Sequence, residues 1–206
     1  MFNDENGIKA LEYVVQLADA NGGAQLLSSF SSGFASGLQD PFITGKIAMQ
    51  CNGNWNQGVY AQYAPHLNYG VSQMPLPPHG VKCSTSGGFC WSIPTKANAP
   101  DEAWSWIEFA SEPENQLFYV KGLGTNPTRL ALLGDRYFQS NPVRKVAVEA
   151  IKNARGWGES PWAGVLWQQY MLNARDQAIY HKATPKAALD TAAAVVQQSI
   201  DSYTRG

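Results

Sequence analysis

The most informative stretch of the chain reads Phe42-Ile43-Thr44-Gly45-Lys46-Ile47-Ala48-Met49-Gln50-Cys51-Asn52-Gly53-Asn54-Trp55. Its apolar run after Gly45 is typical of a short strand, here placed at 46–51. The Asn-Gly-Asn sequence that follows favours an exposed turn. Residues 55–63 then have the pattern of a helix. A strand, a turn and a helix in direct succession predict an α/β fold.

Two more strands are expected on the carboxyl side of this stretch, at 69–73 and 81–93, separated by a proline-rich loop. The second contains Gly87 and Gly88, and glycines inside a strand pattern mark either a bulge or a close approach of another group to the backbone. The three strands are predicted to form a small sheet.

Helical periodicity dominates the rest of the chain, and helices over 7–20, 55–63, 161–180 and 185–203 are predicted to cover that sheet. Between 98 and 155 the sequence predicts further helices, with Asn98 as a cap, Pro100 and Pro142 in first turns, and a capping box at Ser111-Glu112-Pro113-Glu114.

Composition excludes several classes of protein. The 206 residues carry a formal net charge of −1 without basic clusters, so we expect no nucleic-acid partner. No run of eighteen apolar residues predicts a membrane span, and the acidic start of the chain does not resemble a signal peptide. The 7 Trp, 9 Tyr and 8 Phe must either fill a core or line a binding surface.

The three cysteines, Cys51, Cys83 and Cys90, lack metal-ligand spacing, and the histidines are far apart in sequence. We therefore expect no metal and no cofactor. Cys51 and Cys90 lie in apolar runs and are interpreted as buried small side chains, although a disulfide in an oxidising compartment stays open.

Three motifs, in order, resemble the family-1 extracellular solute-binding proteins of ABC importers, the group typified by maltose-binding protein. They are Phe42–Met49 followed by Asn52–Trp55, Gly87–Pro94, and Ala103–Phe109 followed by Ser111–Gln116, Gly122 and Asn126-Pro127. Each motif alone has low specificity, but their joint order is specific, and the resemblance covers about Phe2 to Tyr203.

The resemblance implies a partial periplasmic-binding-protein type II fold, because members of the family are about twice this long. Residues 1–97 and 156–206 are expected to form most of a second lobe with a small mixed sheet. Residues 98–155 would be helices that normally pack on the first lobe. The chain would then be the carboxy-terminal half of such a receptor, in a truncated or fragment form.

The resemblance implies a non-catalytic function, the binding of a carbohydrate for an ABC-type importer. It also implies that the protein is periplasmic or lies at the extracellular cell surface. Its partners would be a carbohydrate ligand and the membrane subunits of the importer. Exposed apolar stripes on residues 98–155 also predict a homodimer. The alternative is a protein-interaction module derived from such a receptor. An enzyme is not expected, since no carboxylate pair or catalytic fingerprint is tied to the aromatic positions.

At three positions that face the ligand in the family, two interpretations stay open in this sequence. Trp55 and Trp167 are each either a flat surface for a ligand or a residue of the core. Gly88 is either a ligand contact or part of a bulge. Trp91, Trp104 and Trp106 are assigned to packing. The predicted ligand-binding residues are Trp55, Gly88, Phe89, Trp157, Trp167, Asn54 and Glu159.

Overall fold

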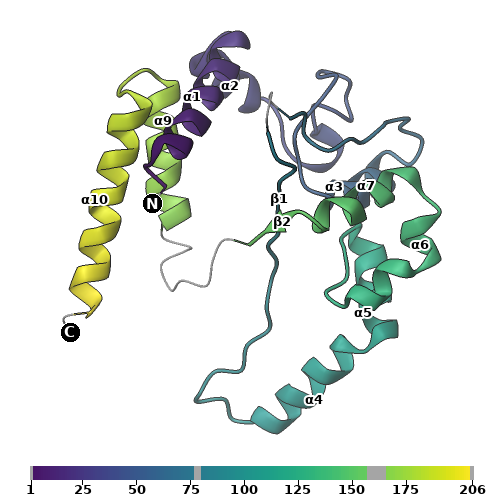
Figure 1. The fold of residues 1–206 in the computed structure, drawn as a ribbon. Helices are drawn as coiled ribbons and strands as arrows, with labels where there is room; N and C mark the ends of the chain where they lie inside the picture. Colours follow the sequence, from purple (N-terminus) through teal and green to yellow (C-terminus); the bar gives the residue numbers. More distant parts are fainter. Residues whose placement is uncertain (1, 77–79, 157–165, 205–206) are drawn as a thin grey trace. The chain divides into compact units, whose positions relative to one another are not determined.

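The computed structural model describes residues 2–76, 80–156 and 166–204 (Figure 1). The chain divides into two compact units: unit 1 comprises residues 1–34 and 158–206, and unit 2 comprises residues 35–157. Unit 1 is therefore assembled from both ends of the chain, and unit 2 from the continuous segment between them.

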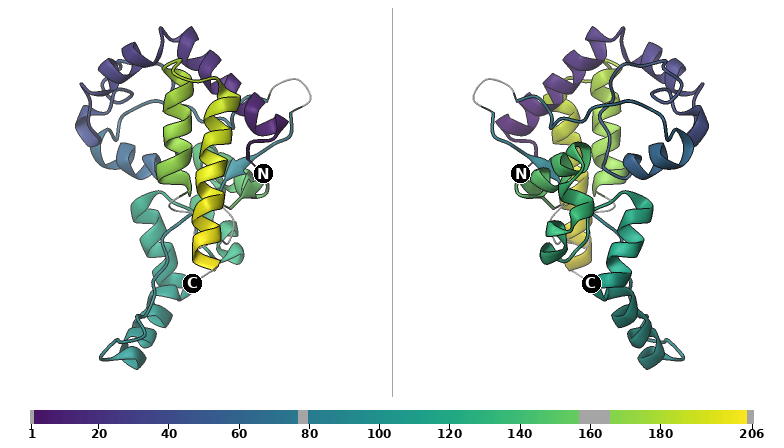
Figure 2. Two further views of the ribbon diagram at one scale, coloured as in Figure 1. Left: turned by 90° about the vertical axis from the view of Figure 1, so that its left-hand side faces the viewer. Right: turned by 90° about the vertical axis from the view of Figure 1, so that its right-hand side faces the viewer.

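Unit 1 is helical among its described residues. It consists of α1 (Glu5–Ala20), α2 (Ala24–Ser31), a π-helical segment η3 (Leu166–Met171), α9 (Leu172–Ile179) and α10 (Pro185–Thr204). Figure 2 shows α1, α9 and α10 side by side. The helices predicted at 7–20 and 185–203 are confirmed, as is the described part of the one predicted at 161–180.

The core of unit 1 joins these three helices. Leu11 of α1 packs with small side chains that allow close helix packing, and Leu189 of α10 is 1% exposed. The buried members of this core are Leu11, Ala174, Ala178, Ala188, Leu189 and Ala192.

Side-chain hydrogen bonds stabilise the helix ends in unit 1. Asp4 caps α1 by accepting a hydrogen bond from the Gly7 amide. The amide of Asn3 donates to Asp190 Oδ1 at 3.0 Å, and His181 Nε2 lies 2.9 Å from Asp19 Oδ1.

Unit 2 begins with a 3₁₀ turn η1 (Gly37–Gln39) and α3 (Asn56–Tyr63) and continues through helices that start at prolines. These are α4 (Pro100–Ser111), α5 (Pro113–Leu123) and α7 (Pro142–Ile151), with η2 (Leu130–Gly134) and α6 (Arg136–Gln139) between the last two. A proline in the first turn loses no helical hydrogen bond, which explains why these starts were predictable.

A small core in unit 2 connects α5, α6 and α7 through Val120, Phe138 and Val148. Phe138 is 1% exposed. Asn141 caps α7 by accepting hydrogen bonds from the amides of residues 143 and 144. The predicted caps of α4 and α5 are wrong: their N-caps are Ala99 and Glu112, and neither makes a side-chain capping bond.

The sheet of unit 2 is smaller than predicted. It consists of two parallel strands, β1 (Ser84–Thr85) and β2 (Ala154–Arg155), with Ser84 opposite Ala154. The strands predicted at 46–51 and 69–73 are absent, and the one predicted at 81–93 is reduced to β1. A strand requires a hydrogen-bonded neighbour, and within the described ranges β2 alone supplies one.

The three cysteines are also placed differently from the prediction. Cys51, Cys83 and Cys90 are free and exposed. Because Cys51 and Cys90 lie in coil rather than in a packed sheet, their apolar neighbours in the sequence do not bury them.

Candidate functional site

Trp55 lies at the amino-terminal end of α3, on the turn made by Asn52, Gly53 and Asn54. The Asn52 Oδ1 accepts a hydrogen bond from the Gly53 amide at 2.8 Å, and the Gly53 carbonyl accepts one from the Asn56 amide at 3.2 Å. The turn therefore leads directly into the helix. Trp55 is 57% exposed, so the alternative of a core anchor is wrong. Its ligand role stays a prediction.

An aromatic cluster holds α3 on a side away from Trp55. Tyr60 is buried, and its ring lies 5.6 Å from that of Phe42 and 5.0 Å from that of Tyr69. Asn56 donates a hydrogen bond to the Tyr60 hydroxyl at 3.2 Å. Burial raises the pKa of the Tyr69 phenol. Because helical residues turn by about 100° each, Tyr60 and Trp55 point in different directions.

A glycine contact fixes α3 against the end of α5. A Cβ on Gly58 would lie 2.4 Å from the Leu123 carbonyl oxygen, and a Cβ on Gly124 would lie 2.4 Å from the Gly58 nitrogen. Gly124 also has φ of 71°, a left-handed conformation that ends α5. Neither position has room for a side chain, and together they fix the helix that carries Trp55.

The second predicted ligand segment is open to solvent. Phe89 is fully exposed, at 104% of its reference area, and a Cβ on Gly88 would meet no atom within 4 Å. Within the described residues, Trp55 and Phe89 make no ring contact with each other. Gly88 lies in coil, so no β-bulge is formed there, and its contact with a ligand stays a prediction.

The other predicted ligand residues are only partly described. Asn54 is half-buried, and its side chain makes no hydrogen bond to the described residues, so its amide is free to meet a ligand. Trp157 and Glu159 lie outside the described residues. The backbone of Trp167 is part of η3, but its side chain lies outside the described part of the structure. Their ligand role stays a prediction.

Three tryptophans assigned to packing are instead half-exposed. Trp91, Trp104 and Trp106 are 49%, 55% and 52% exposed. The rings of Trp91 and Trp106 meet edge to face at 4.9 Å, and Tyr119 lies 6.5 Å from Trp91. Since α4 has no buried residue, Trp106 packs against Trp91 at the surface rather than in a core.

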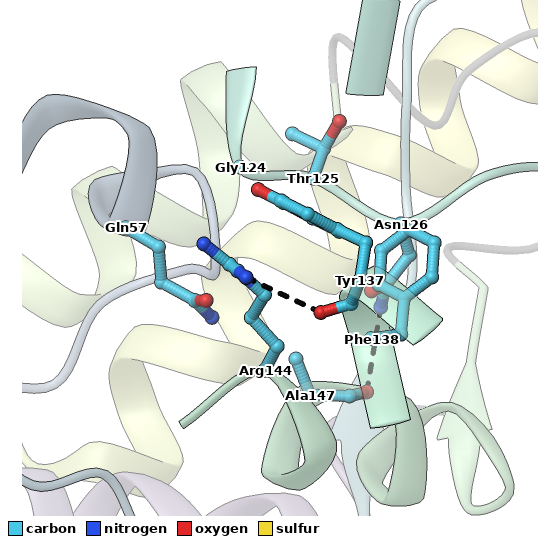
Figure 3. Close-up of a pocket in the computed structure, with 8 residues that line it drawn as sticks. All are labelled: Gln57, Gly124, Thr125, Asn126, Tyr137, Phe138, Arg144 and Ala147. Carbon is cyan, nitrogen blue, oxygen red and sulfur yellow. Dashed lines mark hydrogen bonds between the residues drawn. The ribbon is translucent and has the colours of Figure 1, made fainter. Parts of the chain in front are cut away.

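A pocket missed by sequence reasoning lies where α3, the segment after α5, α6 and α7 meet (Figure 3). The Arg144 guanidinium stacks over the Tyr137 ring at 3.7 Å from its centroid and donates to the Tyr137 carbonyl oxygen at 3.2 Å. The Asn126 amide donates to the Ala147 carbonyl oxygen at 3.3 Å. These contacts join helices, and none of the predicted ligand residues lines the pocket.

The charged groups of the described residues lie at the surface. Among the described residues no polar or charged side chain is buried. No group of three or more His, Cys, Asp or Glu side chains in this part of the chain could hold a metal ion. No helix in the described ranges has the length and apolar character needed to cross a membrane.

The pKa of the Asp135 carboxyl is lowered from its ordinary value. The main cause is the hydrogen bond from the Tyr137 amide, and Lys121 contributes to a lesser extent.

Comparisons with known proteins find both a sequence relative and solved structures that are similar to this chain. The maltodextrin-binding protein MdxE of Bacillus subtilis (strain 168) is 22% identical over 169 residues, which cover 82% of this chain and 40% of that protein. The solved structure of CpMnBP1 with mannotriose bound is 26% identical with a TM-score of 0.77, and covers 91% of this chain and 49% of that one. Its mannobiose complex gives a TM-score of 0.76 at 26% identity, over 91% of this chain and 48% of that one.

The chain therefore spans about half the length, or less, of these relatives. The predicted fold, part of a two-lobed solute-binding protein, is confirmed by these structural matches. Residues 1–146 also match the family described as bacterial extracellular solute-binding protein, and this match covers more than half of the chain. The chain belongs to the bacterial extracellular solute-binding protein family.

Proposed function

We propose that this chain binds a carbohydrate and that the exposed indole of Trp55 is the main contact. The observation that carries the proposal is a large, half-exposed aromatic ring on a turn whose helix is anchored elsewhere by Tyr60. A pyranose presents flat C–H faces, and a rigid aromatic surface covers them without a loss of hydrogen bonds. The family match and the sugar-bound neighbours support this choice.

Hydroxyl groups of the sugar need donors and acceptors, which Asn54 and the backbone near Gly88 would supply. Phe89 would add a second apolar surface. The further contacts proposed are Trp157 and Trp167 as platforms and Glu159 as an acceptor. No step of catalysis is proposed, because a receptor needs contacts to its solute and no activated group.

The wider role follows from the family. We expect residues 1–97 and 156–206 to correspond to much of one lobe, and residues 98–155 to helices that serve the other. In a two-lobed receptor the solute is held between both, and the receptor delivers it to the membrane subunits of an ABC importer outside the cytoplasmic membrane. Linear oligosaccharides are the ligand class to test first, since one relative is named as a maltodextrin-binding protein and the similar solved structures hold mannotriose or mannobiose.

The affinity of this chain alone should be low. Half a cleft supplies about half of the contacts, and each ~1.4 kcal/mol lost weakens binding tenfold. The test is a titration by NMR and calorimetry with mannobiose, mannotriose and maltotriose up to tens of millimolar. Trp55→Ala should strongly weaken the response, whereas Trp104→Ala, which removes an equally exposed indole from α4, should preserve it.

Binding that is as strong in Trp55→Ala as in the unsubstituted chain, or that falls equally in Trp104→Ala, would contradict the proposed site. Submicromolar binding by the isolated chain would contradict the expectation that half of the contacts are missing.

A second candidate function, an interaction module that forms a homodimer, is favoured by the surface of α4 and α5. Trp106, Phe109 and Phe118 are 52%, 58% and 84% exposed on these helices, and monomers rarely expose such a group of aromatic side chains. Light scattering at tens of micromolar should give a dimer mass. A monomer whose residues 98–155 resist proteolysis would contradict this function.

A further inference from the structure

The ring of Trp55 occupies the space that a side chain on Gly53 would need. A Cβ built on Gly53 would lie 2.0 Å from Trp55 Cζ3, 2.2 Å from Cη2 and 2.3 Å from Cε3. Real Cβ atoms do not approach other heavy atoms this closely. Any residue other than glycine at 53 must therefore displace the indole.

The three distances also show which part of the indole faces Gly53. Cε3, Cζ3 and Cη2 are consecutive atoms of the six-membered ring, and their distances to the built Cβ are nearly equal. A position beyond the edge of the ring would lie much farther from the outer two atoms than from the middle one. The Cβ direction of Gly53 therefore points at the face of the indole, and one ring face rests on the turn.

We propose that Gly53 is a positioning residue for sugar binding, because it lets one face of the Trp55 indole lie on the turn and leaves the other face to stack on a pyranose. This inference rests on the proposed function and adds to it a determinant of the ring's orientation. Gly53 acts through Trp55 and need not touch the sugar. Its backbone has no left-handed φ, so the role of this glycine is to leave space rather than to permit a special conformation.

Gly53→Ala tests the role of the missing side chain. Alanine fits the backbone, so the chain should fold, and the indole should rotate to another χ1 rotamer. The matched control is Gly70→Ala, since Gly70 is also a coil glycine without left-handed φ, and a Cβ there meets nothing within 4 Å.

The first measurement follows the ring without any sugar. The chain is labelled with 5-fluorotryptophan, and Trp55→Phe identifies the ¹⁹F signal of residue 55 among those of the seven tryptophans. Gly53→Ala should move this signal and leave the other six in place, and Gly70→Ala should move none. An unmoved Trp55 signal, or a general broadening of all seven, would overturn the positioning role.

The second measurement is the affinity for mannotriose in a double-mutant cycle. Gly53→Ala should weaken binding roughly three- to tenfold, the loss expected when an aromatic contact is misaligned. In the Trp55→Ala background the same change should have no further effect on the residual signal, because residues that act through one contact are not additive.

An equal loss in both backgrounds would overturn the inference while leaving the proposed function intact. If the unsubstituted chain shows no response to mannotriose at tens of millimolar, the proposed function fails, and the role of Gly53 in binding fails with it. The sugar-free spectrum separates these outcomes, because it tests the orientation of the Trp55 ring independently of sugar binding.

Discussion

Alanine substitution at Gly58 and at Gly122 should have opposite effects on stability. Both glycines lie in helices of unit 2, in α3 and α5 respectively. A Cβ on Gly58 would meet backbone atoms of Leu123 and Gly124 at 2.4–3.2 Å, whereas a Cβ on Gly122 would meet nothing within 4 Å. The two substitutions therefore differ in the space available to one methyl group.

The magnitude follows from two terms. Replacing glycine by alanine within a helix stabilises the folded state by about 0.5–1 kcal/mol through the unfolded-chain entropy and helix propensity. This term applies to both variants. At Gly58 the methyl group also forces two backbone segments apart, and overpacking of this kind costs about 1–3 kcal/mol. We expect Gly122→Ala to raise the free energy of unfolding. The free energy of unfolding of Gly58→Ala should be lower than that of Gly122→Ala by about 1–3 kcal/mol.

Urea unfolding followed by far-ultraviolet circular dichroism measures the difference, and a thermal scan should show a separation of about 2–4 °C for each kcal/mol. Unit 1 provides an internal reference, because neither substitution lies in it. A Gly58→Ala variant as stable as Gly122→Ala would refute the glycine contact between α3 and α5. It would also remove one support for the placement of Trp55.

Three further outcomes are expected. Leu189→Ala should destabilise unit 1 by about 2–5 kcal/mol in chemical unfolding, because Leu189 is 1% exposed, whereas truncation of Leu130, 74% exposed, should change stability little. Asn141→Ala should cost about 1 kcal/mol through the loss of its two capping hydrogen bonds, and an unchanged unfolding midpoint would argue against the cap. The pKa of Asp135 is lowered chiefly by the Tyr137 amide, so its contribution to stability is present at neutral pH and is lost as the pH falls through the folded-state pKa. Asp135→Asn should flatten this part of the acid dependence, which carboxyl NMR titration can follow directly.

The helices could be predicted because their signals are local. Pro100, Pro113, Pro142 and Pro185 each begin a helix in the structure, since a proline constrains only its own turn. Capping was less predictable. Ser111–Glu114 has the letters of a capping box, but Glu112 takes the N-cap position and accepts a hydrogen bond from the side chain of Asn115.

The sheet and the environment of the aromatic rings depend on distant partners. Residues 46–51 have the composition of a strand, but composition does not supply the neighbour that a strand must pair with. Trp91 and Trp106 illustrate the same limit: their apolar character predicts a preference for contact, and the structure satisfies it with one ring pair at the surface. The exposure of Trp55 was predictable, because the Asn-Gly-Asn turn before it is a local signal.

The division of the chain into units has a consequence for its synthesis. Leu11 in α1 packs against Ala174 and Leu189, which lie in α9 and α10. A ribosome adding roughly 5–20 residues per second needs on the order of 10–30 s to make the ~160 residues between them. During that interval the whole of unit 2 can fold while α1 has emerged without its partner helices. Helix α1 is therefore buried long after it is made, and during this interval a chaperone or a protease has access to its apolar face.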